Sequence, residues 1–220
     1  MKNLKNMLKI KIAPSILAAD FSDIANEVKR VEAAGADLIH CDVMDGSFVN
    51  NISFGPKFIE DMKKRTKLPL DVHLMIVNPH KYLERFIKAG ADMLSFHLEA
   101  GGDALGNLKL IKSFGIPAGL VISPDTPCEE LIKYADGADF VMLMSVYPGF
   151  GGQKFIEGSL ERIRKTREII GKDKDLEIDG GVTFENVKSI KGAGANVIVA
   201  GNTVFKSDNM AEAIKNLRNF

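Results

Sequence analysis

The sequence of 220 residues has no tryptophan, only two cysteines and no excess of charge of either sign. Lys plus Arg and Asp plus Glu each number 29, so no net field attracts nucleic acid or an acidic membrane surface. Cys41 and Cys128 have no C-x-x-C spacing, which favours a reducing compartment and excludes a thiolate zinc site. No apolar run reaches membrane-spanning length, and the N-terminal "MKNLKNMLKIKI" lacks the apolar core of a secretory signal. We therefore expect a soluble cytoplasmic protein with no nucleic-acid or membrane partner.

Short β-branched and apolar runs alternate with amphipathic stretches of helical length. Residues 20–34, for example, carry apolar residues at three-to-four spacing and begin with Asp20 or Ser22 as a candidate N-cap. This strict alternation predicts βα units and a parallel sheet. The candidate strands cover residues 11–16, 38–44, 70–76, 93–99, 117–122, 140–146, 176–180 and 196–201.

A short repeat marks every second joint between a helix and a strand. It reads "AGAD" at 34–37 and 89–92, "DGAD" at 136–139 and "AGAN" at 193–196. Its glycine is expected to take the left-handed conformation that ends a helix. Eight strands with four equivalent joints predict a (β/α)8 TIM barrel rather than an open doubly wound sheet. No Pro/Ser-rich linker marks a second domain, so residues 1–220 are expected to form one catalytic domain.

Polar side chains recur on the inward face of three candidate strands. Because side chains alternate along a strand, His40 and Asp42 share one face of the second strand. "DVHLM" directs His73 inward in the same way, and "LEIDGG" does so for Glu177 and Asp179. The two histidines with Asp42 and Asp179 are an N/O ligand set that zinc, iron(II), manganese or cobalt accepts. The alternative is four hydrogen-bonded core groups, but their matching heights on three strands favour a metal centre.

Other polar residues suit catalysis less well. Ser15 and Ser145 lack a G-x-S-x-G elbow, which argues against a nucleophilic triad. Cys41 is expected to pack outward, and Asp45, with parity opposite to Asp42, is expected to order the following loop. His97, at the end of the fourth candidate strand, is a candidate for supporting a ligand from behind.

Glycine-rich segments follow the last three candidate strands: "PGFGGQ" at 148–153, "DGGVT" at 179–183 and "AGNTVF" at 200–205. Glycine lets backbone N–H groups approach an anion, and the loops after strands seven and eight are the usual phosphate site of such barrels. These segments predict a phosphorylated substrate. Met44, Met75 and Met144 lie at or near the ends of candidate strands, on their inward faces. A buried methionine usually fills a core, but three at the same height in the barrel also suit a cap that excludes water from the substrate.

Five motifs occur in order along the chain: "IAPSILAADF", "HCDVMDGSFV", "DVHLMI", "SVYPGFGGQKFI" and "DGGVT". With them the sequence closely resembles the ribulose-phosphate 3-epimerase family from end to end. The resemblance implies a TIM-barrel isomerase of the pentose phosphate pathway that interconverts D-ribulose 5-phosphate and D-xylulose 5-phosphate. It also implies one divalent metal ion, with Zn²⁺ expected and Fe²⁺, Mn²⁺ or Co²⁺ as alternatives.

The same resemblance assigns roles to individual residues. Metal ligation is implied for His40, Asp42, His73 and Asp179, and proton transfer for Asp42 and Asp179. The methionines Met44, Met75 and Met144 are the expected substrate cap. The implied substrate contacts are Ser15, His73, Gly149, Phe150, Gly151, Gly152, Asp179, Gly180, Gly181, Gly201 and Asn202.

The chemistry of the residues agrees with this resemblance. Epimerising a carbon beside a ketone needs two acid/base groups on opposite faces of a planar enediolate, one ionised and one protonated. The second and seventh strands lie almost across an eight-stranded barrel, so Asp42 and Asp179 are placed to flank a substrate. A metal would polarise the ketone.

Three positions depart from the family pattern, and other functions stay open. Asn50 replaces a common proline and Asn202 a common serine, whereas Tyr147 replaces a small polar residue and bears on substrate chain length.

The nearest alternative function is that of an epimerase of a phosphorylated hexulose such as D-allulose 6-phosphate. A decarboxylase or aldolase is disfavoured because the proposed strands carry no inward lysine, and a non-catalytic sensor because buried opposing carboxylates are costly. The outer helices are expected to support a homo-oligomer.

Overall fold

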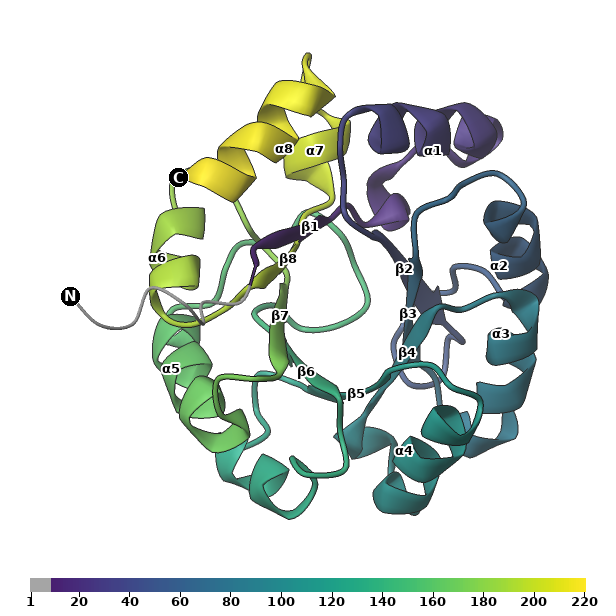
Figure 1. Ribbon diagram of the computed structural model, residues 1–220, viewed down its shortest axis with the longest axis vertical. Coiled ribbons are helices and arrows are strands. Elements are labelled where there is room, and N and C mark those ends of the chain that lie inside the picture. Colours follow the sequence, from purple (N-terminus) through teal and green to yellow (C-terminus); the bar gives the residue numbers. More distant parts are fainter. Residues whose placement is uncertain (1–8) are drawn as a thin grey trace.

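Eight parallel strands form a ring that is surrounded by helices in the computed structural model, which describes residues 9–220 (Figure 1). The strand order is β1-β8-β7-β6-β5-β4-β3-β2, and a parallel bridge between Ser15 and His40 joins the two ends of the sheet. The fold is therefore the predicted TIM barrel. The expectation of no secretory signal rests mainly on residues 1–8, which lie outside the described range.

All eight predicted strands are confirmed, although all except the seventh are shorter than expected, most of all the first and the last. The first ends before a 3-10 turn at Ile16–Ala18, and the last ends before the chain enters a short helix. The strands are β1 Lys11–Ala13, β2 Ile39–Met44, β3 Leu70–Met75, β4 Met93–His97, β5 Ala118–Ile122, β6 Phe140–Met144, β7 Asp175–Asp179 and β8 Val197–Val199.

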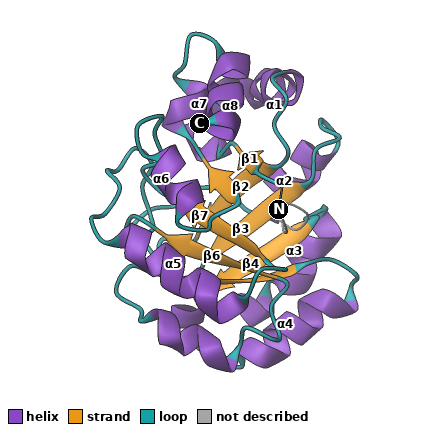
Figure 2. Ribbon diagram, turned by 60° about the vertical axis from the view of Figure 1, so that its left-hand side comes forward, coloured by secondary structure: helices purple, strands orange, loops and turns teal. Residues whose placement is uncertain are grey.

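Helices occupy the connections and cover the outside of the strands (Figure 2). The expected helix at 20–34 is divided: Asp20 caps a 3-10 turn by accepting from the Ser22 backbone N–H, and the α-helix proper follows. The helices are α1 Ile24–Ala33, α2 Pro56–Lys63, α3 Leu83–Ala89, α4 Ala104–Ser113, α5 Ser159–Ile170, α6 Val187–Gly192, α7 Asn202–Phe205 and α8 Met210–Asn219. Among residues 9–220, none of the helices is long and apolar enough to cross a membrane.

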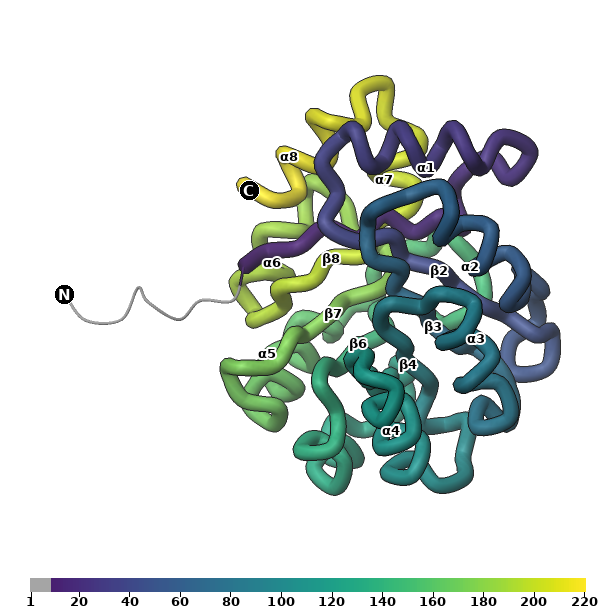
Figure 3. The backbone as a smooth tube through the Cα atoms, turned by 45° about the vertical axis from the view of Figure 1, so that its right-hand side comes forward, coloured from purple at the N-terminus to yellow at the C-terminus, as the bar shows by residue number. Residues whose placement is uncertain are grey.

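The ring of helices closes where α8 packs beside α1 (Figure 3). Arg218 on α8 donates hydrogen bonds to the carbonyl oxygen of Gly35 at 2.8 Å and to Asp37 at 2.7 Å. The main apolar core lies between the outer strand faces and these helices, and it includes Cys41, as its predicted outward orientation requires. Separate buried clusters, with Leu38, Phe140 and Val199 in one of them, lie outside this core, so the inner strand faces carry apolar as well as polar groups.

Three of the four repeated joints have the predicted glycine conformation. Gly35, Gly90 and Gly194 have φ angles of 85°, 112° and 118°, so each supports a left-handed turn into a strand. The expectation for Gly137 is wrong, because its φ is not positive. Its joint follows the 3-10 turn Cys128–Lys133 rather than an α-helix, and the Gly137 N–H donates to the Tyr134 carbonyl to continue that turn.

Candidate active site and metal centre

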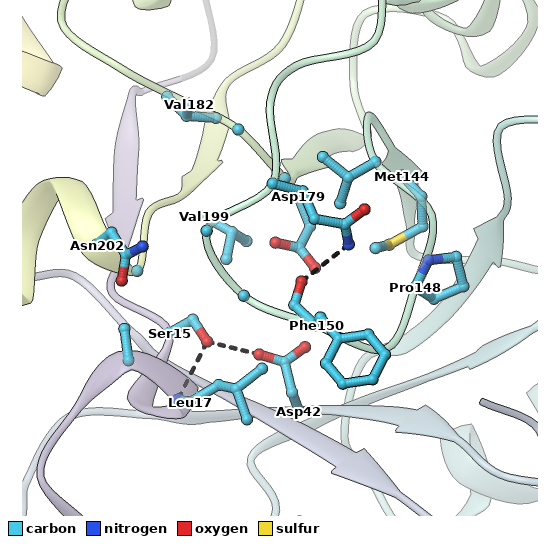
Figure 4. Close-up of a pocket in the computed structure, with 18 of the residues that line it drawn as sticks. Ser15, Leu17, Asp42, Met144, Pro148, Phe150, Asp179, Val182, Val199 and Asn202 are labelled. Carbon is cyan, nitrogen blue, oxygen red and sulfur yellow. Dashed lines mark hydrogen bonds between the residues drawn. The ribbon is translucent and has the colours of Figure 1, made fainter. Parts of the chain in front are cut away.

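A pocket opens at the C-terminal end of the barrel (Figure 4). Every predicted substrate-contact residue except His73 lines it, and so do the three methionines predicted as a cap. His40 and His73 lie fully buried below the pocket, whereas Asp42 and Asp179 reach it from β2 and β7. In the chain's ring order β1 and β8 separate these two strands, so the two carboxylates approach from different walls.

The four predicted metal ligands converge in one cluster, with one ligand atom from each within 4.8 Å of the others. Oδ1 of Asp42 lies 3.3 Å from Nε2 of His40 and 3.3 Å from Nδ1 of His73. Oδ2 of Asp179 lies 4.0 Å from the same two nitrogens. This cluster of two imidazoles and two carboxylates is able to hold a divalent cation.

A buried carboxylate supports His40 from behind. Nδ1 of His40 lies 2.6 Å from Oδ2 of Asp71, and Nε2 has no hydrogen-bond partner among residues 9–220. Burial opposes a charge on His40, but the neighbouring Asp42 and Asp71 outweigh that effect and raise its pKa well above the usual range. An unpartnered buried nitrogen that faces three other donor atoms is what a metal ligand requires.

His97 supports His73 in a similar way. Their Nε2 atoms are 2.8 Å apart, and Nδ1 of His97 lies 3.2 Å from Oε2 of Glu99. Burial lowers the pKa of His97 to about 4 and also lowers that of His73. Burial favours the neutral acid at Glu99, but hydrogen bonds from His97, Thr126 and Ser123 lower its pKa to about 2. His97 therefore lies behind a candidate ligand, as expected.

The two pocket carboxylates have opposite protonation tendencies. Burial acts to raise the pKa of Asp42, but the charge of His40 and the close approach of both imidazoles hold it well below its usual range. Ser15 also donates a hydrogen bond of 2.5 Å to Oδ2 of Asp42, and Figure 4 shows its hydroxyl between Asp42 and the Leu17 backbone. Burial, and then the negative charge of Asp42, raise the pKa of Asp179 to about 7.

Sequence reasoning gave no role to Asp71 or to the inward-facing Glu177. With His40 they form a second group of potential ligand atoms, all buried and within 4.8 Å of one another. Burial and the charge of Asp71 raise the pKa of Glu177 well above its usual range. The available signal for Asp71 was its parity with His73, since both belong to the "DVH" of β3.

Glycines of the β6, β7 and β8 loops meet around the pocket. A Cβ on Gly152 would lie 2.7 Å from Nδ2 of Asn202, and one on Gly181 would lie 2.3 Å from the Phe155 backbone nitrogen. Both glycines also have positive φ, at 77° and 65°. At Gly181 the contact is with backbone, so no side chain fits there, and at Gly152 the positive φ disfavours one.

Two further contacts hold the loop after β6. Nδ2 of Asn51 donates to the carbonyl of Gly149 at 2.7 Å, a role that sequence reasoning missed. The Tyr147 hydroxyl donates to Asp125 at 2.9 Å, and Tyr147 lines the pocket. Asp45 orders its own loop as expected, by accepting from the backbone of Ser47, Phe48 and Val77.

Solved structures with a similar backbone arrangement, but low sequence identity, establish the fold only. A tryptophan synthase alpha-subunit mutant from Pyrococcus furiosus matches 96% of this chain and 96% of its own with a TM-score of 0.70 at 18% identity. A 3-hexulose-6-phosphate synthase covers 96% of this chain and 98% of its own with a TM-score of 0.67 at 20% identity.

Curated sequences are far more similar. The ribulose-phosphate 3-epimerase of Bacillus subtilis is 47% identical over 213 residues, which covers 95% of this chain and 98% of that protein. The enzyme of the same name from Synechocystis is 48% identical over 215 residues, covering 96% and 94%. The chloroplastic ribulose-5-phosphate-3-epimerase of Arabidopsis thaliana is 46% identical, covering 95% and 76%. Residues 11–205 also match the family model described as "Ribulose-phosphate 3 epimerase family". The chain belongs to the ribulose-phosphate 3-epimerase family.

Proposed function

We propose that this protein interconverts D-ribulose 5-phosphate and D-xylulose 5-phosphate by epimerisation at C3. Family membership supports the substrate. The observation that carries the chemistry is the pair of pocket carboxylates, because one has its pKa held low and the other has its pKa raised to about 7. Near neutral pH such a pair supplies one base and one acid, as inversion at a carbon requires.

Asp42 and Asp179 are the proposed proton-transfer residues. In one direction the ionised Asp42 accepts the C3 proton, and the protonated Asp179 donates to the other face of the planar enediolate. The reverse direction begins with the opposite protonation states. The hydrogen bond from Ser15 keeps one Asp42 oxygen fixed, so the carboxylate is held in one orientation toward the substrate.

His40, Asp42, His73 and Asp179 are the proposed ligands of one divalent ion, with Zn²⁺ expected. The residues fit such an ion, because the donor set is the N/O type and His40 presents an unpartnered buried nitrogen to it. When bound, the ion would supply Lewis-acid stabilisation of negative charge on the substrate oxygens. His40 and His73, buried below the pocket, would then be neutral nitrogen ligands of the ion.

The glycine loops are the proposed phosphate site. Gly180, Gly181, Gly201 and Asn202 border the pocket at the ends of β7 and β8, where backbone N–H groups can approach an anion. Gly149 to Gly152 cover the pocket from β6. Met44, Met75 and Met144 line the pocket, where they would exclude water from the reacting carbon.

Several broader assignments complete the proposal. Residues 1–220 act as one catalytic domain, the protein resides in the cytoplasm, and it forms a homo-oligomer through its outer helices. The phosphorylated hexulose is not favoured, since the curated relatives described above carry the name of the pentulose enzyme. Sedimentation of the purified protein tests the oligomer.

An isotope experiment tests the proposed reaction. The protein is incubated with D-ribulose 5-phosphate in D₂O, and both xylulose 5-phosphate formation and deuterium at C3 are followed by NMR. We expect both signals, their loss with a chelator and their return with added metal. D-allulose 6-phosphate, tested in parallel, should turn over more slowly.

Substitutions identify the proton-transfer residues in the same assay. Asp42→Asn and Asp179→Asn should each abolish net epimerisation, with Asp61→Asn on the surface of α2 as the matched control. Near-full C3 exchange in both pocket variants would contradict the assignment. Faster turnover of the hexulose phosphate would instead contradict the substrate.

A further inference from the structure

The imidazole of His97 lies between His73, a proposed metal ligand, and the carboxylate of Glu99. Its side chain is completely buried and stacks against His73, with ring centroids 5.0 Å apart, and it also packs against Phe48 at 4.8 Å. Both contacts restrict the space in which the imidazole can turn. Its Nε2 faces Nε2 of His73 at 2.8 Å, and its Nδ1 faces Glu99 at 3.2 Å.

The close approach of two Nε2 atoms permits one proton between them. Either His73 donates to His97, or His97 donates to His73, because two N–H groups cannot point at each other at 2.8 Å. In the first arrangement His73 is able to bind a metal through Nδ1, once the ion displaces any proton that this nitrogen shares with Asp42, 3.3 Å away. In the second arrangement a neutral His73 carries its proton on Nδ1, and metal binding there is blocked.

Glu99 selects the first arrangement. Its Oε1 accepts hydrogen bonds from the backbone N–H of Ser123 at 2.7 Å and from the Thr126 hydroxyl. Only Oε2 therefore faces His97. A carboxylate accepts but does not donate, so Nδ1 of His97 must carry a proton, and Nε2 of a neutral His97 is then an acceptor. The Ser123 hydroxyl oxygen, 3.3 Å from the same Nδ1, can accept as well.

We propose that His97 and Glu99 are positioning residues, which fix the tautomer of His73 so that its Nδ1 is presented to the metal. This inference rests on the proposed function for its metal. Both hydrogen bonds are donated in the same direction: His73 Nε2–H donates to His97 Nε2, and His97 Nδ1–H donates to Glu99. Second-sphere carboxylates of this kind orient imidazole ligands and raise their basicity.

The wild-type protein offers a direct test. The chain contains only four histidines, so long-range ¹H–¹⁵N spectra of uniformly ¹⁵N-labelled protein can be assigned residue by residue. We expect His97 to carry its proton on Nδ1, with or without metal, and His73 to carry its proton on Nε2 in the zinc-loaded protein. A proton on Nε2 of neutral His97 would overturn the proposal without any substitution.

Glu99→Gln tests the role of the carboxylate. An amide can donate to Nδ1 of His97 and so permit the opposite arrangement, with little change in shape. Zn²⁺ or Co²⁺ affinity should fall by about 10- to 100-fold, and the His97 proton should move toward Nε2. Glu84→Gln, at an exposed position on α3, is the matched control and should bind metal as the wild type does.

His97→Gln separates positioning from packing. A glutamine oxygen can still accept from His73 Nε2–H, so this variant should retain more metal affinity than His97→Leu, which leaves that N–H unpartnered. Equal affinities in these two variants, or wild-type affinity in Glu99→Gln, would overturn the proposal. Absence of both metal binding and C3 exchange in the wild type would instead overturn the proposed function. The His97 tautomer would still show whether the hydrogen bond to Glu99 has the proposed direction.

Discussion

Nδ1 of His40 lies 2.6 Å from Oδ2 of Asp71, and both side chains are completely buried. The register of the sheet places these residues directly opposite each other on β2 and β3. Because the short contact occupies Nδ1, it directs Nε2 of His40 into the cluster of metal-ligand candidates. Asp71 is thus placed to orient a candidate metal ligand from behind.

Asp71→Asn should weaken metal binding without abolishing it. The amide oxygen can still accept from Nδ1 of His40, but the charge that makes the imidazole a stronger base is lost. We expect Zn²⁺ affinity to fall by about tenfold or more, measured by competition with a coloured chelator. Asp136→Asn, at an exposed position, is the control. Equal affinities in the two variants would show that the contact only fills space.

Metal affinity should depend on pH through Asp179. Its pKa in the metal-free protein is raised to about 7, and a protonated carboxyl group binds a metal far more weakly than the ionised form does. Below pH 7 a proton therefore competes with the metal, and affinity should fall by about tenfold per pH unit from this group alone. Above pH 7 the contribution disappears. Calorimetric titrations at pH 5.5, 6.5 and 7.5 check this slope, and the same slope in Asp179→Asn would exclude Asp179 as its source.

The fold and the cluster of candidate metal ligands were accessible from the sequence because both depend on short-range patterns. Period-two alternation within β2, β3 and β7 placed His40, His73 and Asp179 on inner faces, and the structure brings them together. The joint at Gly137 was misjudged because a four-residue motif does not reveal whether the preceding turn is an α-helix or a 3-10 turn.

The residues behind the ligands were less accessible, because their roles depend on which side chains meet across strands. Asp71 has the right parity, but only the register between β2 and β3 places it against His40. Glu99 lies just beyond β4, and its contacts come from Ser123 and Thr126 after β5. The residue pattern within a single strand does not predict these contacts between strands and loops.

Ser15→Ala should slow epimerisation mainly through kcat. The substitution removes a 2.5 Å hydrogen bond to the Asp42 carboxylate, a charged contact whose loss costs about 1.5–3 kcal/mol. That energy corresponds to about a 10- to 100-fold lower rate if it is expressed fully in the transition state.

The same variant should change the pH profile. Loss of a donor to the ionised form raises the pKa of Asp42, so the acidic limb of the kcat profile should move to higher pH. Ser113→Ala, on the surface of α4, should leave both quantities unchanged. A lower rate with an unmoved acidic limb would place the role of Ser15 in substrate binding rather than at Asp42.

Gly181→Ala should impair both the β7 loop and binding of the phosphorylated substrate. A Cβ at this position would lie 2.3 Å from the backbone nitrogen of Phe155, and the φ of 65° disfavours any side chain. The backbone must therefore shift, at a cost of about 1–3 kcal/mol, and the N–H groups that border the pocket move with it. Thermal unfolding should show a lower midpoint, and KM for ribulose 5-phosphate should rise more than kcat falls. Gly192→Ala in α6 is the matched control, because open space surrounds that position and alanine favours a helix. A destabilised variant with unchanged KM would mean that phosphate binds elsewhere.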